Sequence, residues 1–270
     1  MELRPVTPIS ILAKKMEQLL ESHADLIQSR SGLAEELELC YQIAAGLDPY
    51  TEKHTTQESA ALKRLTEQTK NYDWSDSENP EFVKGLEAEM LSGHVEGKFL
   101  KILVSGLKAK NILEIGVFSG YSAIAMAEGL DAGGNIVACE LDKRAAAFAE
   151  DQFKKAGVSE KITMKIGPAL ESLHNLADEK SKFDMVFLDA DKHNYENYVR
   201  FILDNNLLSA DGLLVVDNTL LQAEVYLDNH ECSVPGKAIA SFNEYITKEP
   251  RVEQVIIPLR DGVTLARLVN

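Results

Sequence analysis

From residue 111 onward the chain alternates short apolar runs with amphipathic segments, and this alternation restricts its fold more than any other feature. The apolar runs have the length of buried strands. They lie at Asn111–Ile115, Asn135–Cys139, Ile162–Ile166, Met185–Leu188 and Leu213–Val216. The amphipathic segments lie near residues 120–130, 143–156, 168–178 and 193–206. This pattern predicts βαβ units, in which a mostly parallel sheet carries helices on both faces.

The C-terminal part of the chain breaks the alternation. A helix is expected over Ala238–Thr247, and Pro250 then leads into two apolar runs, Glu253–Pro258 and Val263–Val269. The turn Arg260-Asp261-Gly262 separates these two runs. Strands joined so directly form an antiparallel hairpin. An ordinary dinucleotide-binding fold would instead continue to alternate strands and helices.

The first eighty residues carry no strand signal. Apolar residues fall at helical spacings over Ile9–Ile27, over Gly32–Ala45 and around Thr56–Thr69. We expect Gly46–Pro49 to end the second of these helices. The polar stretch Asn71–Pro80 looks like a connection. The predicted organisation is an N-terminal helical extension, residues 1–80, and a main domain, residues 81–270.

Charge and hydropathy exclude several classes of function. Asp and Glu outnumber Lys and Arg by 43 to 28, a net charge of −15, so no nucleic-acid partner is expected. No apolar run has the roughly 18–20 residues of a membrane span, and the N-terminus lacks a signal peptide's apolar region, so we expect a cytoplasmic address and no membrane partner. Cys40, Cys139 and Cys232 have no paired spacing, and we expect reduced thiols in or near the core.

A glycine-containing loop follows the first expected strand, in the segment NILEIGVFSGYS from Asn111 to Ser122. Gly116 and Gly120 allow either a tight strand-to-helix turn or a close approach to a ligand, and the segment is neither a P-loop nor a GxGxxG fingerprint. Glu140 ends the next strand, 26 residues after Glu114. An acid there is either an ordinary exposed residue or an acceptor for ribose hydroxyls. The glycine-containing loop and Glu140 together favour a nucleoside-containing cofactor that is not bound through a phosphate group.

Polar side chains also follow the next two strands. Asp189, Asp191, Lys192 and His193 come after one strand, and Asp217-Asn218 after its neighbour. Parallel strands bring these ends to one edge, where oxygen ligands suit Mg²⁺ or Ca²⁺. The alternative is that the Asp residues only cap the following helices.

Five ordered motifs, LEIGVFSGYS, ACELD, GPAL, FLDADK and VDNTL, are similar to those of cation-dependent O-methyltransferases of the catechol and caffeoyl-CoA type. The resemblance covers about residues 90–270 and implies a Rossmann-like class I methyltransferase fold with a seven-stranded sheet. It implies S-adenosylmethionine as cofactor and a divalent cation, Mg²⁺, with Lys192 as catalytic base and Asp189 as a further catalytic residue. It assigns the cation to Asp189, Asp217 and Asn218. It assigns cofactor contacts to Ser92, Glu114, Gly116, Val117, Ser122, Glu140, Ala169, Asp189 and Asp191.

The segments AAGLDPY, TTQESAAL and EMLSGHVEGKFLKIL further resemble O-methyltransferases of cyanobacterial mycosporine biosynthesis, over essentially the whole chain. That resemblance implies methylation of demethyl-4-deoxygadusol to 4-deoxygadusol. Alternatives are a catechol or phenylpropanoid O-methyltransferase and a non-catalytic nucleotide-binding scaffold. The caffeoyl-CoA type carries an acid where this chain has Val95, which argues against a phenylpropanoid-CoA acceptor.

Three further expectations concern the surroundings of the site. Lys192 is preferred to His193 as base, provided that burial or a cation lowers its pKa. The segment Leu221–Pro235, with Tyr226 and His230, is long enough to form a loop facing the acceptor, beside Met90–His94. The N-terminal helices either stabilise the domain, or cover the carboxyl edge of the sheet or join a homodimer interface.

Overall fold

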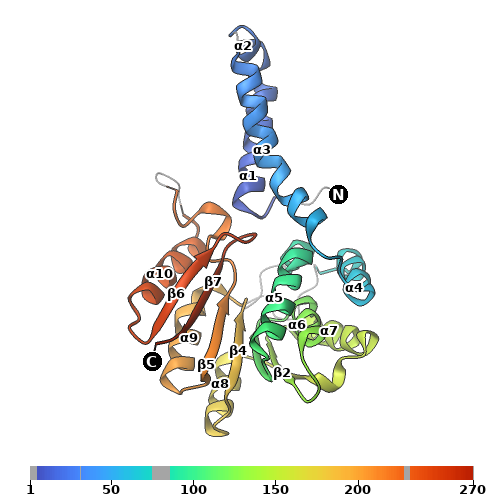
Figure 1. Cartoon of the computed structure of the whole chain (residues 1–270), viewed down its shortest axis with the longest axis vertical. Coiled ribbons are helices and arrows are strands. Elements are labelled where there is room, and N and C mark those ends of the chain that lie inside the picture. The colour runs from blue at the N-terminus through green and yellow to red at the C-terminus, as the bar shows by residue number, and fades with distance from the viewer. Residues whose placement is uncertain (1–4, 31, 75–85, 228–231, 270) are drawn as a thin grey trace.

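A seven-stranded sheet forms the centre of the computed structural model, which describes residues 5–30, 32–74, 86–227 and 232–269 (Figure 1). The strand order is β3-β2-β1-β4-β5-β7-β6, with β1 to β5 parallel and β7 antiparallel to both neighbours. The strands are β1 (Asn111–Ile115), β2 (Asn135–Glu140), β3 (Ile162–Ile166), β4 (Phe183–Leu188), β5 (Leu208–Val216), β6 (Val252–Ile257) and β7 (Val263–Leu268). The predicted fold class, including the C-terminal antiparallel hairpin, is confirmed.

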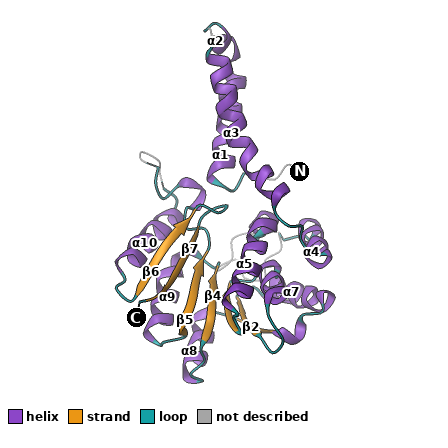
Figure 2. Ribbon diagram, viewed as in Figure 1, coloured by secondary structure: helices purple, strands orange, loops and turns teal. Residues whose placement is uncertain are grey.

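Helices cover both faces of the sheet and divide the interior into two cores (Figure 2). One face carries α5 (Gly93–Leu107), α6 (Tyr121–Gly129) and α7 (Lys143–Ala156), and the other carries α8 (Ala169–Asp178), α9 (Tyr195–Asp204) and α10 (Val234–Lys248). Successive strand side chains point to opposite faces, so Ile112 belongs to the first core and Leu113 to the second. Strands buried on both sides explain the near-continuous apolar runs.

The N-terminal helices α1 (Pro8–Ser22), α2 (Ala24–Gln28) and α3 (Leu33–His54) form a hairpin that projects from the main body (Figure 1). The expected first helix is divided at His23, and the prediction that Gly46–Pro49 ends the second helix was wrong. Pro49 lacks one backbone donor, but the helix is held there by packing against α1, where Thr7 Oγ1 donates to Asp48 Oδ2 at 2.6 Å.

The base of the hairpin reaches the carboxyl edge of the sheet. There α1 contacts the short helix η4 (Leu221–Ala223), which follows β5, and α3 contacts α5. The N-terminal extension therefore lies beside the loops that follow the strands.

Helix α4 (Ala60–Asn71) packs into the core of the main domain, where Leu65 is fully buried. Trp74, at the start of the predicted connection, is also buried, and its ring centroid lies 4.5 Å from that of Phe118 in the β1–α6 loop. The expected boundary near residue 80 lies outside the described residues.

Two further features of the described residues concern membrane spans and the cysteines. No helix in these ranges is both long and apolar enough to cross a membrane. All three cysteines are free, and Cys139 is buried in β2, but Cys40 is exposed on α3 rather than placed in or near the core.

Candidate active site

The β1–α6 loop owes its glycines to contacts within the chain. Gly116 has φ +91°, and a Cβ there would lie 2.0 Å from the carbonyl oxygen of Asp189. Gly120 has φ +89°, and its Cβ would lie 2.6 Å from the Phe153 ring. Only glycine fits such a conformation and such close approaches. The tight-turn interpretation thus explains both glycines, and the evidence for a ligand comes from the neighbouring carboxylates.

Glu114 is one of these carboxylates and is fully buried at the carboxyl end of β1. Burial raises its pKa to about 8, against the opposing effect of a hydrogen bond from the Ser122 hydroxyl, while the nearby charge of Asp189 raises it further. The second oxygen, Oε2, has no hydrogen-bond partner in the described chain. A buried acceptor without a partner is rare in proteins and suits a bound donor or cation.

Glu140, at the end of β2, holds the same loop. Its Oε2 accepts hydrogen bonds from Val117 N at 3.0 Å and Phe118 N at 2.7 Å, and its Oε1 accepts one from Asp142 N at 2.8 Å. Burial raises the pKa of this carboxyl, and the three backbone donors oppose that rise. The predicted ribose acceptor is therefore also the residue that fixes the shape of the loop.

Asp189 and Asp217 directly follow the adjacent strands β4 and β5. Their backbone amides donate to Ile115 O and Leu188 O, each at 2.9 Å, which fixes both residues at the same edge. Asp217 accepts a hydrogen bond from Asn218 N at 2.6 Å. Burial, followed by repulsion from Asp189, raises the pKa of Asp217 to about 6. The edge therefore concentrates negative charge beside the amide of Asn218.

The capping alternative for Asp217-Asn218 is wrong. The short helix η4 that follows has Leu220 at its N-cap and no side-chain capping bond, and the next α-helix, α10, starts at Val234 and is capped by Ser233. Within the described ranges, no group of three or more His, Cys, Asp or Glu side chains is arranged to hold a metal ion. The expected donor set differs from such a group because its third member is the Asn218 amide.

Lys192 reaches this cluster, whereas His193 is exposed. Its Nζ donates to Asp189 Oδ1 and to the Tyr195 hydroxyl, both at 2.8 Å. Burial alone would lower the pKa of Lys192, but its interactions with Asp189, Tyr195 and Asp217 together outweigh burial and raise the pKa above its usual value. The expectation of a lowered pKa therefore does not hold for the chain by itself.

Three residues near the cluster were not predicted as site residues: Tyr195, Glu96 and Arg260. Glu96, on α5, is buried, and Arg260 Nε lies 3.4 Å from its Oε2. Burial raises the pKa of Glu96, and the charge of Asp217 raises it further. Tyr195 could have been found from the sequence, because it follows Lys192 by three residues, a helical spacing. Glu96 and Arg260 could not, because nothing in the sequence pairs α5 with the β6–β7 turn.

The other predicted cofactor residues lie on several segments of the chain. Ser92 is buried just before α5, and Ala169 is the first residue of α8. Gly167 N donates to Glu140 O at 2.8 Å, which brings the start of α8 beside the end of β2. Both oxygens of Asp191 accept hydrogen bonds within the chain, from the Asn194 amide and the Tyr198 hydroxyl.

The side chain of Glu224 joins the loop after β5 to the residue that caps α10. Glu224 Oε2 accepts hydrogen bonds from the backbone and the hydroxyl of Ser233, at 2.9 and 2.5 Å. Tyr226 within this loop is 55% exposed. His230 lies outside the described residues.

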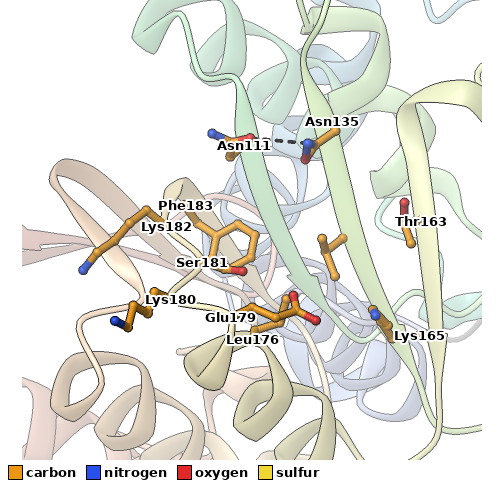
Figure 3. Close-up of a pocket in the computed structure, with 11 residues that line it drawn as sticks. Asn111, Asn135, Thr163, Lys165, Leu176, Glu179, Lys180, Ser181, Lys182 and Phe183 are labelled. Carbon is orange, nitrogen blue, oxygen red and sulfur yellow. Dashed lines mark hydrogen bonds between the residues drawn. The ribbon is translucent and has the colours of Figure 1, made fainter.

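A pocket of about 450 Å³ lies elsewhere, at the amino ends of β1 and β2 (Figure 3). Asn111 and Asn135 begin these strands and are hydrogen-bonded there at 3.3 Å, with Lys180 and Lys182 nearby. Ligands of open α/β sheets bind at the carboxyl ends of strands, so the candidate site is the opposite edge.

Comparisons with known proteins agree with this fold. The profile of a family described as O-methyltransferase matches residues 52–269. A caffeoyl-CoA O-methyltransferase of Petroselinum crispum is 34% identical over 225 residues, covering 79% of this chain and 86% of the relative.

Solved structures give the same family likeness. SAH-bound PaMTH1, a methyltransferase of Podospora anserina, is 30% identical with a TM-score of 0.73, covering 85% of this chain and 96% of that one. An O-methyltransferase of Bacillus cereus in complex with SAH is 29% identical with a TM-score of 0.70, covering 83% and 97%. Since the family profile spans most of the sequence, the chain belongs to the O-methyltransferase family.

Proposed function

We propose that this chain transfers a methyl group from S-adenosylmethionine to a hydroxyl of a small metal-chelating acceptor. The proposal rests on the presence of two groups of polar residues at one edge of the sheet, one suited to a cofactor and one suited to a cation. Glu114 and Glu140 surround the β1–α6 loop, and Asp189, Lys192 and Asp217 follow the adjacent strands. A nucleotide-binding scaffold has no use for the second group.

The cofactor fits the first group. Glu114 Oε2 is a buried acceptor without a partner, which suits the positively charged part of S-adenosylmethionine. Glu140 retains lone pairs for the two ribose hydroxyls. The SAH-bound structures of PaMTH1 and of the Bacillus cereus enzyme support the same cofactor.

A divalent cation fits the second group. Asp189, Asp217 and Asn218 offer hard oxygen donors, and the mutual repulsion of the carboxylates, which raises the pKa of Asp217, would be relieved by a positive charge. When bound, the cation lowers the pKa of a chelated hydroxyl, as metals do for water, and Mg²⁺ is the ion that we propose.

The chain's own residues complete the transfer. Lys192 accepts the proton of the acceptor hydroxyl when other positive charge offsets the carboxylates that raise its pKa, and the Tyr195 hydroxyl holds its Nζ in place. The oxygen then attacks in line, so that the O–CH₃ bond forms while the S–CH₃ bond breaks and SAH leaves.

For the acceptor we propose demethyl-4-deoxygadusol, giving 4-deoxygadusol in mycosporine biosynthesis. Neighbouring oxygens on its enolised ring can chelate a cation as a catechol does. A catechol or phenylpropanoid acceptor is the alternative, and the caffeoyl-CoA O-methyltransferase of Petroselinum crispum favours it. The departure at Val95 argues against a phenylpropanoid-CoA acceptor, and the neighbouring His94 contacts Thr56 O within the chain through its Nε2 at 2.6 Å.

Product masses test this function. We expect a gain of one methyl group when the protein is incubated with S-adenosylmethionine, Mg²⁺ and demethyl-4-deoxygadusol, with slower turnover of caffeate, catechol and caffeoyl-CoA. Faster turnover of a phenolic acceptor would replace the proposed acceptor, and no methylation of any member of the panel would contradict the proposed activity.

The projecting hairpin suggests a homodimer. Helix α3 packs on α1 through the face that includes Ala44, and its other face carries the α3 stripe, defined as Leu39, Ile43, Leu47 and Tyr50, each more than half exposed. An apolar stripe pairs with itself in a two-fold contact. We therefore propose that a second copy of the chain covers the stripe and that the hairpin base shapes the acceptor pocket.

Removing the hairpin tests both roles. A chain beginning at Thr55 keeps α4 and is expected to bind S-adenosylmethionine normally, to be monomeric, and to raise the acceptor KM about tenfold, or about 1.4 kcal/mol. Calorimetry, light scattering and steady-state kinetics measure these properties.

Two further variants separate the roles. Leu39→Asp combined with Ile43→Asp is expected to dissociate the dimer only, because these residues lie away from the hairpin base. A chain beginning at Asn79 is expected to be unstable, since it lacks the buried Leu62 and Leu65. An unchanged KM in the chain beginning at Thr55 would exclude the hairpin from the acceptor pocket.

A further inference from the structure

The turn between β6 and β7, Arg260-Asp261-Gly262, packs against the segment that carries Asn218. Asn218 Nδ2 lies 3.5 Å from Asp261 Oδ2, and Gln222 N donates to Asp261 Oδ1 at 2.5 Å. Thr219 N donates to Gly262 O at 3.0 Å. The turn is thus bonded to the segment through side chain and backbone together.

The segment that it holds has an unfavourable backbone. Four non-glycine residues in the six positions 218–223 have positive φ: Asn218 (+58°), Leu221 (+33°), Gln222 (+54°) and Ala223 (+73°). Such conformations cost free energy and persist only where the surrounding structure enforces them. The contacts of the turn with Asn218, Thr219 and Gln222 hold both ends of the segment in this conformation.

The turn itself is fixed from two sides. Leu220 N donates to Asp261 O at 2.9 Å, and a Cβ on Gly262 would lie 2.4 Å from Leu220 Cγ, so the two segments are in close contact. On the other side, Arg260 pairs with the buried Glu96 and donates to Leu91 O at 3.3 Å. The turn is therefore anchored to α5 independently of β5.

We propose that Asp261 is a positioning residue that orients the Asn218 amide for the cation. Asp261 accepts from Gln222 N through Oδ1 and faces the Asn218 NH₂ with Oδ2, so it holds the NH₂ group on its own side and leaves the amide oxygen on the other side. Partners of this kind, which orient the ligands of a metal, strongly affect metal affinity. The inference rests on the proposed cation site.

Asp261→Asn tests the proposal, because it keeps an acceptor for Gln222 N but places a second NH₂ opposite that of Asn218. Mn²⁺, which shares the oxygen preference of Mg²⁺, is titrated into the protein and the free ion is followed by electron paramagnetic resonance, with Mg²⁺ as competitor. We expect the Kd for the ion to rise about 10- to 100-fold. Affinity for S-adenosylmethionine, measured by calorimetry, should stay within about twofold.

Two variants complete the experiment. Asp211→Asn makes the same change of charge at an exposed position of β5 and should leave both affinities unchanged. Gly262→Ala keeps Asp261 but displaces Leu220, so it should weaken the binding of the ion and leave the affinity for S-adenosylmethionine unchanged. If Asp261→Asn does not fold, this second variant serves as the test of the proposal.

The outcomes separate this inference from the proposed function. Unchanged ion affinity in folded Asp261→Asn, or parallel loss of ion and S-adenosylmethionine, would overturn the positioning role while the wild-type protein still binds both. A wild-type protein that binds S-adenosylmethionine but not Mn²⁺ or Mg²⁺ would overturn the cation site and this inference with it.

Discussion

Replacing Asp217 with alanine is expected to reduce methyl transfer by more than about 100-fold, because the carboxylate is a proposed donor to the cation. Affinity for S-adenosylmethionine should be largely preserved, since the proposed cofactor residues Glu114 and Glu140 lie on other strands. Addition of EDTA to the wild-type protein should abolish turnover, and Mg²⁺ should restore it. Initial rates and calorimetry measure the two effects.

The matched control is Asp211→Ala, an exposed acid on the same strand, which should retain full activity. Mg²⁺ should not rescue Asp217→Ala at concentrations that saturate the wild-type protein. Full activity of the wild-type protein in EDTA would remove the cation from the mechanism and leave the family assignment intact.

Replacing Glu140 with alanine is expected to weaken S-adenosylmethionine binding by about 1.5–3 kcal/mol, the contribution of a hydrogen bond to a charged group. The structure adds a second cause, because the change also removes the acceptor of Val117 N and Phe118 N and so loosens the β1–α6 loop. Titration calorimetry measures the affinity, and thermal unfolding measures the effect on the loop.

Glu140→Gln distinguishes the two causes. Glutamine keeps one oxygen that can accept from the loop amides but loses the charge. The midpoint temperature of unfolding of Glu140→Gln should therefore be closer to that of the wild type than the midpoint temperature of Glu140→Ala is. Its cofactor affinity should fall between the two. Wild-type affinity in Glu140→Ala would exclude this residue from the cofactor site.

The sheet was predictable from the sequence because buried parallel strands are short, almost wholly apolar and separated by amphipathic helices. The hairpin of β6 and β7 was predictable from the short turn at Arg260–Gly262. Pro49 misled the prediction, because local propensity does not include the contact between Asp48 and Thr7 that sustains α3. Local sequence likewise gave no sign that α4 belongs to the main core.

The candidate site residues likewise differ in whether local sequence is enough to predict their placement. The placement of Glu114, Glu140, Asp189 and Asp217 at one edge of the sheet was predictable because the end of a strand can be recognised locally. The contacts of Arg260 with Glu96, and of Asp261 with Asn218, join segments far apart in the chain, and a single sequence carries no pattern that pairs them. The pKa of Lys192 depends on the balance between burial and Asp189, which only the geometry defines.

Gly116 has a consequence for directed evolution of this chain. Its missing Cβ lets the β1–α6 loop touch the backbone of Asp189, so the loop that carries Val117 and the strand end that carries Asp189 cannot be varied independently. Random libraries at residue 116 should return glycine alone. Useful diversity in acceptor choice should therefore be sought in the exposed part of the loop after β5, around Tyr226, rather than in the β1–α6 loop.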